Sequence, residues 1–115
     1  MADHPADVTE GDGAIVVLIT ASSPEEADKI GRRLVEDRLA ACANIVPNVR
    51  SLFVWEGKFC QENEALLVVK SRRGRFQELV SRVEQLHSYS VPEIIALPIV
   101  EGSAAYLSWL SESTS

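Results

Sequence analysis

Apolar residues recur along the chain with two different periods, and each period predicts a different kind of element. Residues 14–20 form a short, nearly all-apolar run rich in β-branched side chains. This pattern is typical of a strand that is covered by a helix layer or on both faces. Residues 24–38 and 75–87 instead place apolar side chains three and four positions apart. That spacing predicts two amphipathic helices.

The two predicted helices also carry start signals. Ser23 can cap the first helix, and Pro24 occupies its first position, where a missing N–H costs nothing. Glu26 falls where a capping box places its carboxylate. Ser71 or Gly74 marks the start of the second helix. The start signals and the periodicity therefore agree on where both helices begin.

The longest apolar stretch predicts a hairpin. Residues 41–55 are interrupted by Pro47, which cannot donate to a strand ladder and so predicts a bulge or bend. A tight turn follows at residues 55–58, where Gly57 can take the positive φ that such a turn needs, and the return run covers residues 59–70. Each arm has about 12 to 15 residues, against roughly 5–6 in an ordinary strand. A hairpin of this length extends past a domain of this size and calls for a partner.

A strand at residues 93–99 and a short helix capped by Ser103 complete the series, and Pro98 places the end of that strand at a sheet edge. The predicted order is β-α-β-β-α-β-α, with two βαβ-like halves at 14–55 and 58–99. We therefore expect an α+β fold, a ferredoxin-like split βαβ sandwich. It has a mostly antiparallel four-stranded sheet, a long central hairpin, two helices on one face and an added C-terminal helix.

Composition narrows the class of protein. The 115 residues fit one domain, placed at 14–115 after a disordered acidic tail at 1–13. The net charge of −6 lies partly in that tail, because 14–115 hold 11 basic and 13 acidic residues, a balance of −2. Without a dominant basic face, nucleic acid is not an expected partner. No apolar run approaches the roughly 20 residues of a membrane helix, and the N-terminus lacks a signal-peptide pattern, so we expect a cytoplasmic protein with no membrane partner.

Four segments of the chain match, in order, motifs of one known family. They are Arg38-Leu-Ala-Ala-Cys-Ala-Asn-Ile45, Ser51-Leu-Phe-Val-Trp-Glu-Gly-Lys58, His87-Ser-Tyr-Ser-Val-Pro-Glu-Ile-Ile95 and Tyr106-Leu-Ser-Trp-Leu110. The chain thereby resembles the CutA-type divalent-cation tolerance proteins, whose H-P-Y-x-x-P-E-I motif is similar to the third segment. The resemblance implies a cytoplasmic homotrimer joined through the 41–70 hairpin. It also implies a role in tolerance to divalent metal ions, chiefly copper, with no established catalytic activity.

The chain departs from some family members where metal binding is proposed. Some bacterial members carry a cysteine where this chain has Ile19, and two adjacent histidines where it has Leu86 and His87. Ser88 replaces the usual proline of the motif. The resemblance implies no obligatory cofactor, and for Cu(II) or another divalent cation it leaves one of three ligands, His87.

Two residues are candidate metal ligands. His87 could bind copper or zinc through a neutral imidazole, or it could cap the last turn of its helix. Cys42, between two alanines at a strand entrance, is the second candidate, and its alternative is a buried, inert thiol. Cys60 lies in a more polar stretch and is expected to be the more exposed and oxidisable of the two. We expect both cysteines to be reduced.

A further set of polar and aromatic residues flanks the apolar runs and would line a cleft between subunits if the hairpin docks against a neighbour. Acidic oxygens there suit hard divalent cations, whereas Lys70 and Tyr89 suit a small anionic ligand. The alternative is ordinary interface ion pairing and hydrogen bonding. An anionic ligand would fit a second function, a trimeric sensor or scaffold similar to PII signalling proteins, although the loop between the middle strands is only Glu56-Gly57. The cleft candidates are Trp55, Lys58, Glu62, Glu64, Lys70, Tyr89 and Glu93.

The remaining candidates favour structural roles. The cluster Arg72-Arg-Gly-Arg75 precedes a helix but has no phosphate-loop motif around it, so we expect a solvated group of charges. Tyr106 and Trp109 are expected to fasten the last helix to the sheet. Because the chain has no nucleophile-elbow motif and no second histidine in 14–115, we expect it not to be an enzyme.

Overall fold

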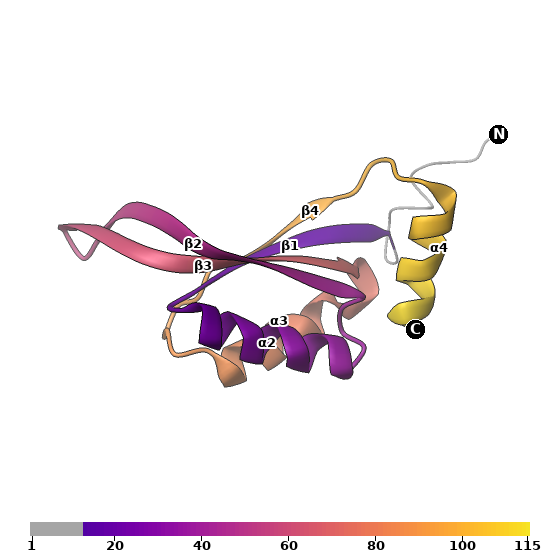
Figure 1. Cartoon of the computed structure of the whole chain (residues 1–115), viewed down its shortest axis with the longest axis horizontal. Helices are drawn as coiled ribbons and strands as arrows, with labels where there is room; N and C mark the ends of the chain where they lie inside the picture. Colours follow the sequence, from indigo (N-terminus) through magenta and orange to yellow (C-terminus); the bar gives the residue numbers. More distant parts are fainter. Residues whose placement is uncertain (1–12) are drawn as a thin grey trace.

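One four-stranded sheet, covered on one face by two helices, forms the body of the protein in a computed structural model that describes residues 13–115 (Figure 1). The strand order is β2-β3-β1-β4, and every neighbouring pair is antiparallel. This is the predicted ferredoxin-like α+β sandwich, and β4 lies at an edge as Pro98 indicated. The elements are β1 (Ala14–Ala21), α2 (Pro24–Glu36), β2 (Cys42–Trp55), β3 (Lys58–Arg72), the 3-10 turn η1 (Arg73–Arg75), α3 (Phe76–Leu86), β4 (Ile94–Pro98) and α4 (Ala104–Ser113).

The start of the domain differs from the prediction by one residue. Of the predicted tail 1–13, residues 1–12 lie outside the described residues. Gly13 is buried, and its carbonyl accepts a hydrogen bond from the N–H of Arg73 at 2.9 Å. Gly13 therefore belongs to the folded domain. No helix of residues 13–115 is long and apolar enough to cross a membrane.

The start of α2 follows the predicted cap with one change. Ser23 is the N-cap, with extended backbone angles, and its hydroxyl accepts the N–H of Glu26 at 3.1 Å. The carboxylate of Glu26 does not return to Ser23. It accepts the N–H and the hydroxyl of Ser22, at 2.9 and 2.8 Å, one residue earlier than in a capping box.

The start of α3 has no side-chain cap, so the prediction of Ser71 as its start is wrong. Ser71 lies inside β3, is fully buried, and donates its hydroxyl to the carbonyl of Leu39 at 2.7 Å. The chain instead enters α3 through the turn η1, which contains Gly74. A buried hydroxyl needs a partner, and the strand position gives Ser71 one.

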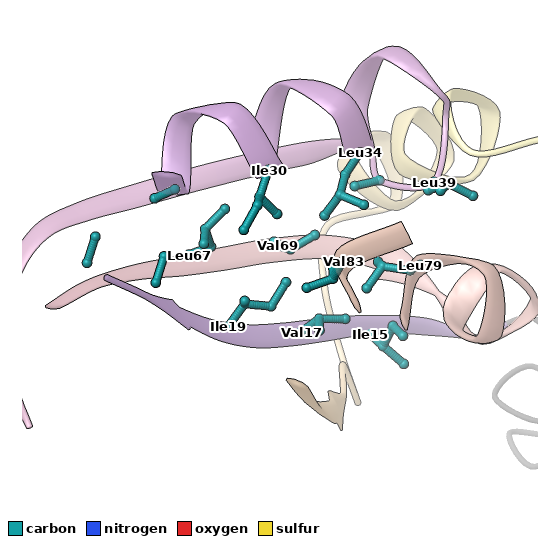
Figure 2. Close-up of a cluster of buried hydrophobic side chains, with 14 residues drawn as sticks. Ile15, Val17, Ile19, Ile30, Leu34, Leu39, Leu67, Val69, Leu79 and Val83 are labelled. Atoms are coloured by element: carbon teal, nitrogen blue, oxygen red, sulfur yellow. The ribbon is translucent and has the colours of Figure 1, made fainter. Parts of the chain in front are cut away.

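The hydrophobic core lies between the helices and one face of the sheet (Figure 2). Alternate residues of β1 are buried, as the two-residue period of a strand requires. Ile19, at the position where some relatives carry a cysteine, is one of them and packs fully buried in this core. The labelled core residues of Figure 2 are Ile15, Val17, Ile19, Ile30, Leu34, Leu39, Leu67, Val69, Leu79 and Val83.

The predicted hairpin extends far beyond the helix layer (Figure 1). The β2–β3 register shifts between Val46 and Val49, which confirms the bulge expected at Pro47. Glu56 and Gly57 both have positive φ, 51° and 80°, as a tight two-residue hairpin turn requires. The chain extends over 52 × 28 × 22 Å, and its Cα radius of gyration is 15.3 Å, against about 13 Å for a compact domain of this length.

Helix α4 lies at the opposite end of the sheet from the hairpin tip (Figure 1). Tyr106 contacts the sheet as predicted: burial first, and then the charge of the Cys42 side chain in β2 and a hydrogen bond with it, raise the pKa of Tyr106. Trp109 is 45% exposed and contacts Tyr106 at 5.4 Å between ring centroids. Further contacts that the sequence did not predict hold the end of the helix. Thr114 is fully buried, and its carbonyl accepts hydrogen bonds from Arg72 at 2.8 Å and Arg75 at 2.9 Å. The arginine cluster is therefore not simply solvated, since two of its members anchor the end of α4.

Candidate functional site

A cavity of about 770 Å³ opens where the outer half of the hairpin meets the segment between α3 and β4. Three strands and the segment between α3 and β4 contribute residues to the cavity, so it is formed by tertiary structure and not by one sequence motif. The lining residues are Thr20 of β1, Ser51, Leu52, Phe53 and Trp55 of β2, Cys60, Glu62 and Glu64 of β3, and Tyr89, Ser90, Val91 and Glu93 of the α3–β4 segment.

The hairpin register places the wall residues of β2 and β3 side by side. Ser51 lies opposite Glu62, and Phe53 lies opposite Cys60. Side chains two positions apart share one face of a strand, so Trp55 joins Phe53 on this wall. The result is one wall that combines aromatic rings with a carboxylate and a thiol.

One of the carboxylates that line the cavity is buried. Glu64 is only 7% exposed, and its Oε2 accepts the hydroxyl of Tyr89 at 2.6 Å. Burial first, and then the hydrogen bond to Glu64 and the negative charge of that group, raise the pKa of Tyr89 above its ordinary value. Tyr89 therefore remains a neutral hydrogen-bond donor. Within residues 13–115, Glu64 forms no ion pair, and its Oε1 has no hydrogen-bond partner.

Glu26 fixes the segment that carries Tyr89. Its Oε2 accepts the backbone N–H of Ser88 at 2.7 Å, while its Oε1 is bound by Ser22. Burial by itself would raise the pKa of Glu26, but the hydrogen bonds from Ser22 and Ser88 outweigh it and lower the pKa to about 2. The start of α2 and the exit of α3 are thus tied together by one ionised carboxylate.

His87 is a positioning residue in this arrangement. Its side chain is fully buried; Nε2 donates to the carbonyl of Thr20 at 2.7 Å, and Nδ1 accepts the N–H of Tyr89 at 3.0 Å. His87 occupies the C-cap position of α3, yet its ring contacts β1 and not the helix carbonyls. Both ring nitrogens are engaged in holding Tyr89 against the end of the sheet.

The two candidate metal ligands do not come together in one chain. Cys42 lies opposite Lys70 on the sheet, and Lys70 lies opposite Val16, four positions along β1 from Thr20, the partner of His87. The Cys42 thiol is partly buried and contacts the Asn44 side-chain oxygen at 3.6 Å. Among residues 13–115, no group of three or more histidine, cysteine or acidic side chains could hold a metal ion. These residues therefore do not fit an inner-sphere copper site within one chain.

The seven cleft candidates divide into two groups. Five of them line the cavity, and Lys58 and Lys70 do not. Lys58 lies at the hairpin tip opposite Trp55, and Lys70 is bound to the side-chain oxygen of Asn44 at the other end of the sheet. Lys70 and Tyr89 therefore do not form one site within a chain. The lining contains no lysine or arginine.

Sequence reasoning missed seven of the lining residues. For the β2 and β3 members a signal existed, because Ser51 and Phe53 alternate with the same period as Trp55, and Cys60 with the same period as Glu62. Thr20 and Ser90 gave no such signal, because only the chain's path after α3 brings them to the cavity.

The two cysteines form no disulfide, as expected: both Cys42 and Cys60 are free. Both side chains are partly buried, so the prediction that Cys60 is the more exposed of the two is not confirmed.

The fold and the cavity define a ferredoxin-like α+β protein with an acidic, aromatic cavity beside its hairpin. Residues 15–113 match the sequence profile of the family described as "CutA1 divalent ion tolerance protein". The chain belongs to this family, as the four sequence motifs indicated.

Individual relatives agree with this assignment. The "Divalent-cation tolerance protein CutA" of Thermus thermophilus is 52% identical over 86% of this chain and 96% of its own length. "Protein CutA, chloroplastic" of Arabidopsis thaliana is 45% identical over 88% of this chain and 56% of its own length. A solved structure of the Thermus thermophilus protein superposes with a TM-score of 0.87 and 51% identity, over 89% of this chain and 99% of that one. A structure from Archaeoglobus fulgidus, described as a periplasmic divalent cation tolerance protein CutA, gives 0.86 and 41% over 89% and 99%.

Proposed function

We propose that this chain acts in tolerance to divalent metal ions, chiefly copper, as a non-enzymatic homotrimer in the cytoplasm. The observation that carries the proposal is family membership over nearly the whole domain, with relatives named for divalent-cation tolerance. The cellular location differs among the relatives: one is described as periplasmic and two as chloroplastic.

Self-association is supported by what a single chain leaves uncovered. The sheet ends in two open edge strands, β2 and β4, whose outer backbone groups can pair with another chain. The outer hairpin adds exposed apolar side chains, with Leu52 59%, Val54 67% and Phe59 64% exposed. Exposed apolar residues clustered on a projecting hairpin favour a protein–protein contact. The number of three copies rests on the resemblance to the family.

Direct metal binding by one chain is expected to be weak. His87 has both ring nitrogens engaged, and Cys42 lies at another part of the sheet. Calorimetric titration with Cu(II), Zn(II) and Ca(II) tests this directly. Tight binding that disappears in His87→Ala would contradict the expectation and assign His87 as a ligand.

The assembly is tested by light scattering on the purified chain. We expect a mass three times the 12.6 kDa of one chain. Val54→Asp should reduce that mass, because it places a charge on the exposed apolar hairpin. Val100→Asp is the matched control, since Val100 is 82% exposed in a loop outside the hairpin. A monomeric wild-type protein would refute the trimer.

Tolerance itself is tested in cells that lack the endogenous protein. Growth in rising Cu(II) should be restored by the wild-type chain and by Val100→Asp, and restored less by Val54→Asp. Equal growth with and without the wild-type chain would refute the tolerance role, whatever the mass measurement gives.

A further inference from the structure

Helix α4 contributes little to the hydrophobic core of the chain. Of its ten residues, Ala104–Ser113, Leu110 is the only one that is buried. A helix that packs on a domain through an apolar stripe buries three or four side chains in every two turns. The core also closes without α4, because its buried residues come from β1, α2, the turn after α2, β3 and α3 (Figure 2). Other contacts must therefore hold α4 within the chain.

Three arginines provide those contacts, and each comes from a different part of the fold. Arg38, in the turn after α2, donates to the carbonyl of Glu112 at 2.6 Å. Arg72 of β3 and Arg75 of η1 both donate to the carbonyl of Thr114, at 2.8 and 2.9 Å. The last carbonyls of a helix have no partner within the helix and carry a partial negative charge, so cationic donors stabilise them. All of these contacts lie within one chain, at the end of the sheet opposite the hairpin tip (Figure 1).

The backbone at Arg38 is strained, and its side chain gives a reason for the strain. Its φ is 61°, in the left-handed region that glycine adopts freely and that other residues usually avoid. It directly follows Asp37, the C-cap of α2, and glycine is the usual residue at this position. A glycine could not donate to the carbonyls of Glu112 and Ser115, as the Arg38 guanidinium does. The turn therefore holds a strained residue whose side chain fastens α4.

The chain between β4 and α4 has the features of a hinge. The N–H of Ile99 donates to the carbonyl of Ala14 at 3.0 Å, the last backbone bond to the sheet before α4 in the described part of the chain. Residues 100–103 are exposed and include Gly102. The hydroxyl of Ser103 then accepts the N–H of Tyr106, so the first turn of α4 is capped from within its own segment.

We propose that α4 is a strap that opens as one unit about residues 100–103 when Arg38, Arg72 and Arg75, the arginine latch, release its last carbonyls. The sheet, α2 and α3 stay folded, because a segment with few buried apolar contacts opens at a lower free energy than the whole domain. Salt screens the contacts between arginines and a helix end, so the strap should open more readily as the salt concentration rises. This device is additional to the role in divalent-ion tolerance and does not rest on it.

Native-state amide exchange on the full-length chain, followed by mass spectrometry of its peptides, measures this opening. After correction for intrinsic rates, we expect the amides of α4 to exchange at least about tenfold faster than those of β1. Sodium chloride should speed the exchange of α4 and leave that of β1 unchanged.

Matched variants test the latch. Arg38→Gly removes one arm of it and suits a φ of 61°, so it should speed the exchange of α4 about tenfold while the urea midpoint of the domain changes little. Arg38→Gln keeps the backbone strain and should speed the exchange of α4 to the same degree. Arg32→Gln is the control, because Arg32 is an exposed arginine that pairs with Asp28 within α2. It should leave the exchange of α4 unchanged.

Three results would overturn the proposal. One is exchange of the α4 amides only together with those of β1. Another is an exchange rate of α4 that both Arg38 variants leave unchanged, or that Arg32→Gln raises equally. The last is a rise in Val54→Asp, the variant designed to weaken assembly, as large as the rise in Arg38→Gly. That rise would show that a neighbouring copy holds α4 in place.

Discussion

Glu26 offers the sharpest test of how the site is held in place. Its carboxylate binds Ser22 at the start of α2 and the N–H of Ser88 after α3, and its side chain is 12% exposed. In Glu26→Gln the shape remains but the charge is lost. The amide can still accept hydrogen bonds from Ser22, although its NH₂ group faces the N–H of Ser88 whenever the oxygen faces Ser22. We therefore expect a loss of stability and a freer Ser88.

The magnitude follows from the pKa of Glu26, which falls from 4.5 to about 2 on folding. At 1.36 kcal/mol for each tenfold change in proton affinity, this corresponds to about 3 kcal/mol. The side chain has some access to solvent, so about 2 kcal/mol is the expected loss at pH 7. Because the folded-state pKa is depressed, the wild-type contribution is complete above pH 4.5 and is lost as the pH falls toward 2. The difference between wild type and variant should shrink over that window.

Urea denaturation at pH 7 and at pH 3, with equal protein concentrations throughout, measures this difference. Equal concentrations matter because association shifts apparent stability by mass action. Glu25→Gln is the matched control: Glu25 lies in the same first turn of α2, so both changes remove a negative charge near the helix N-terminus. Amide exchange should become faster at Ser22 and Ser88 in Glu26→Gln only. Equal losses in both variants, or a loss that does not change with pH, would refute the reasoning.

Three further substitutions test the fold by urea denaturation. Leu34→Ala removes a fully buried side chain between α2 and the sheet and should cost about 2–5 kcal/mol; a loss under 1 kcal/mol would contradict the core assignment. Ser71→Ala leaves the buried carbonyl of Leu39 without its donor and should cost about 1–3 kcal/mol, against no change for the exposed Ser81→Ala. Gly57→Ala should cost about 1 kcal/mol through its φ of 80° alone, because no atom lies within 4 Å of the added Cβ; an unchanged stability would show that the turn relaxes.

The fold could be predicted because its determinants are local. The alternating burial of β1 and the caps at Ser23 and Ser103 can be seen in short stretches of sequence, and the structure has them there. The predictions failed where a side chain finds its partner far away in the sequence. Ser71 resembles a helix start, but its hydroxyl donates to Leu39, 32 residues away. The arginines before α3 resemble solvated charges, but Arg72 and Arg75 bind Thr114, about 40 residues away.

The site was predictable in composition but not in arrangement. Flanking polar and aromatic residues marked Trp55, Glu62, Glu64, Tyr89 and Glu93, and all five line one cavity. The same criterion also selected Lys58 and Lys70, because a flanking position does not show which end of the sheet a residue will occupy. The α3–β4 segment decides this, since Glu26 and His87 fix it beside the outer hairpin.

Two unsatisfied features of the described residues lie at the hairpin end of the molecule: exposed apolar side chains and a buried carboxylate. At the other end, the arginines near α4 have the carbonyl of Thr114 as a partner, and the core under the helices is closed. At the hairpin end, apolar side chains remain exposed, and the buried Glu64 has no cationic partner among the described residues. Apolar surface is satisfied by another protein surface, and a buried carboxylate is satisfied by a cationic side chain that such a surface can carry. Both features therefore lie where the proposed assembly places a neighbouring copy of the chain, and Val54→Asp tests that contact directly.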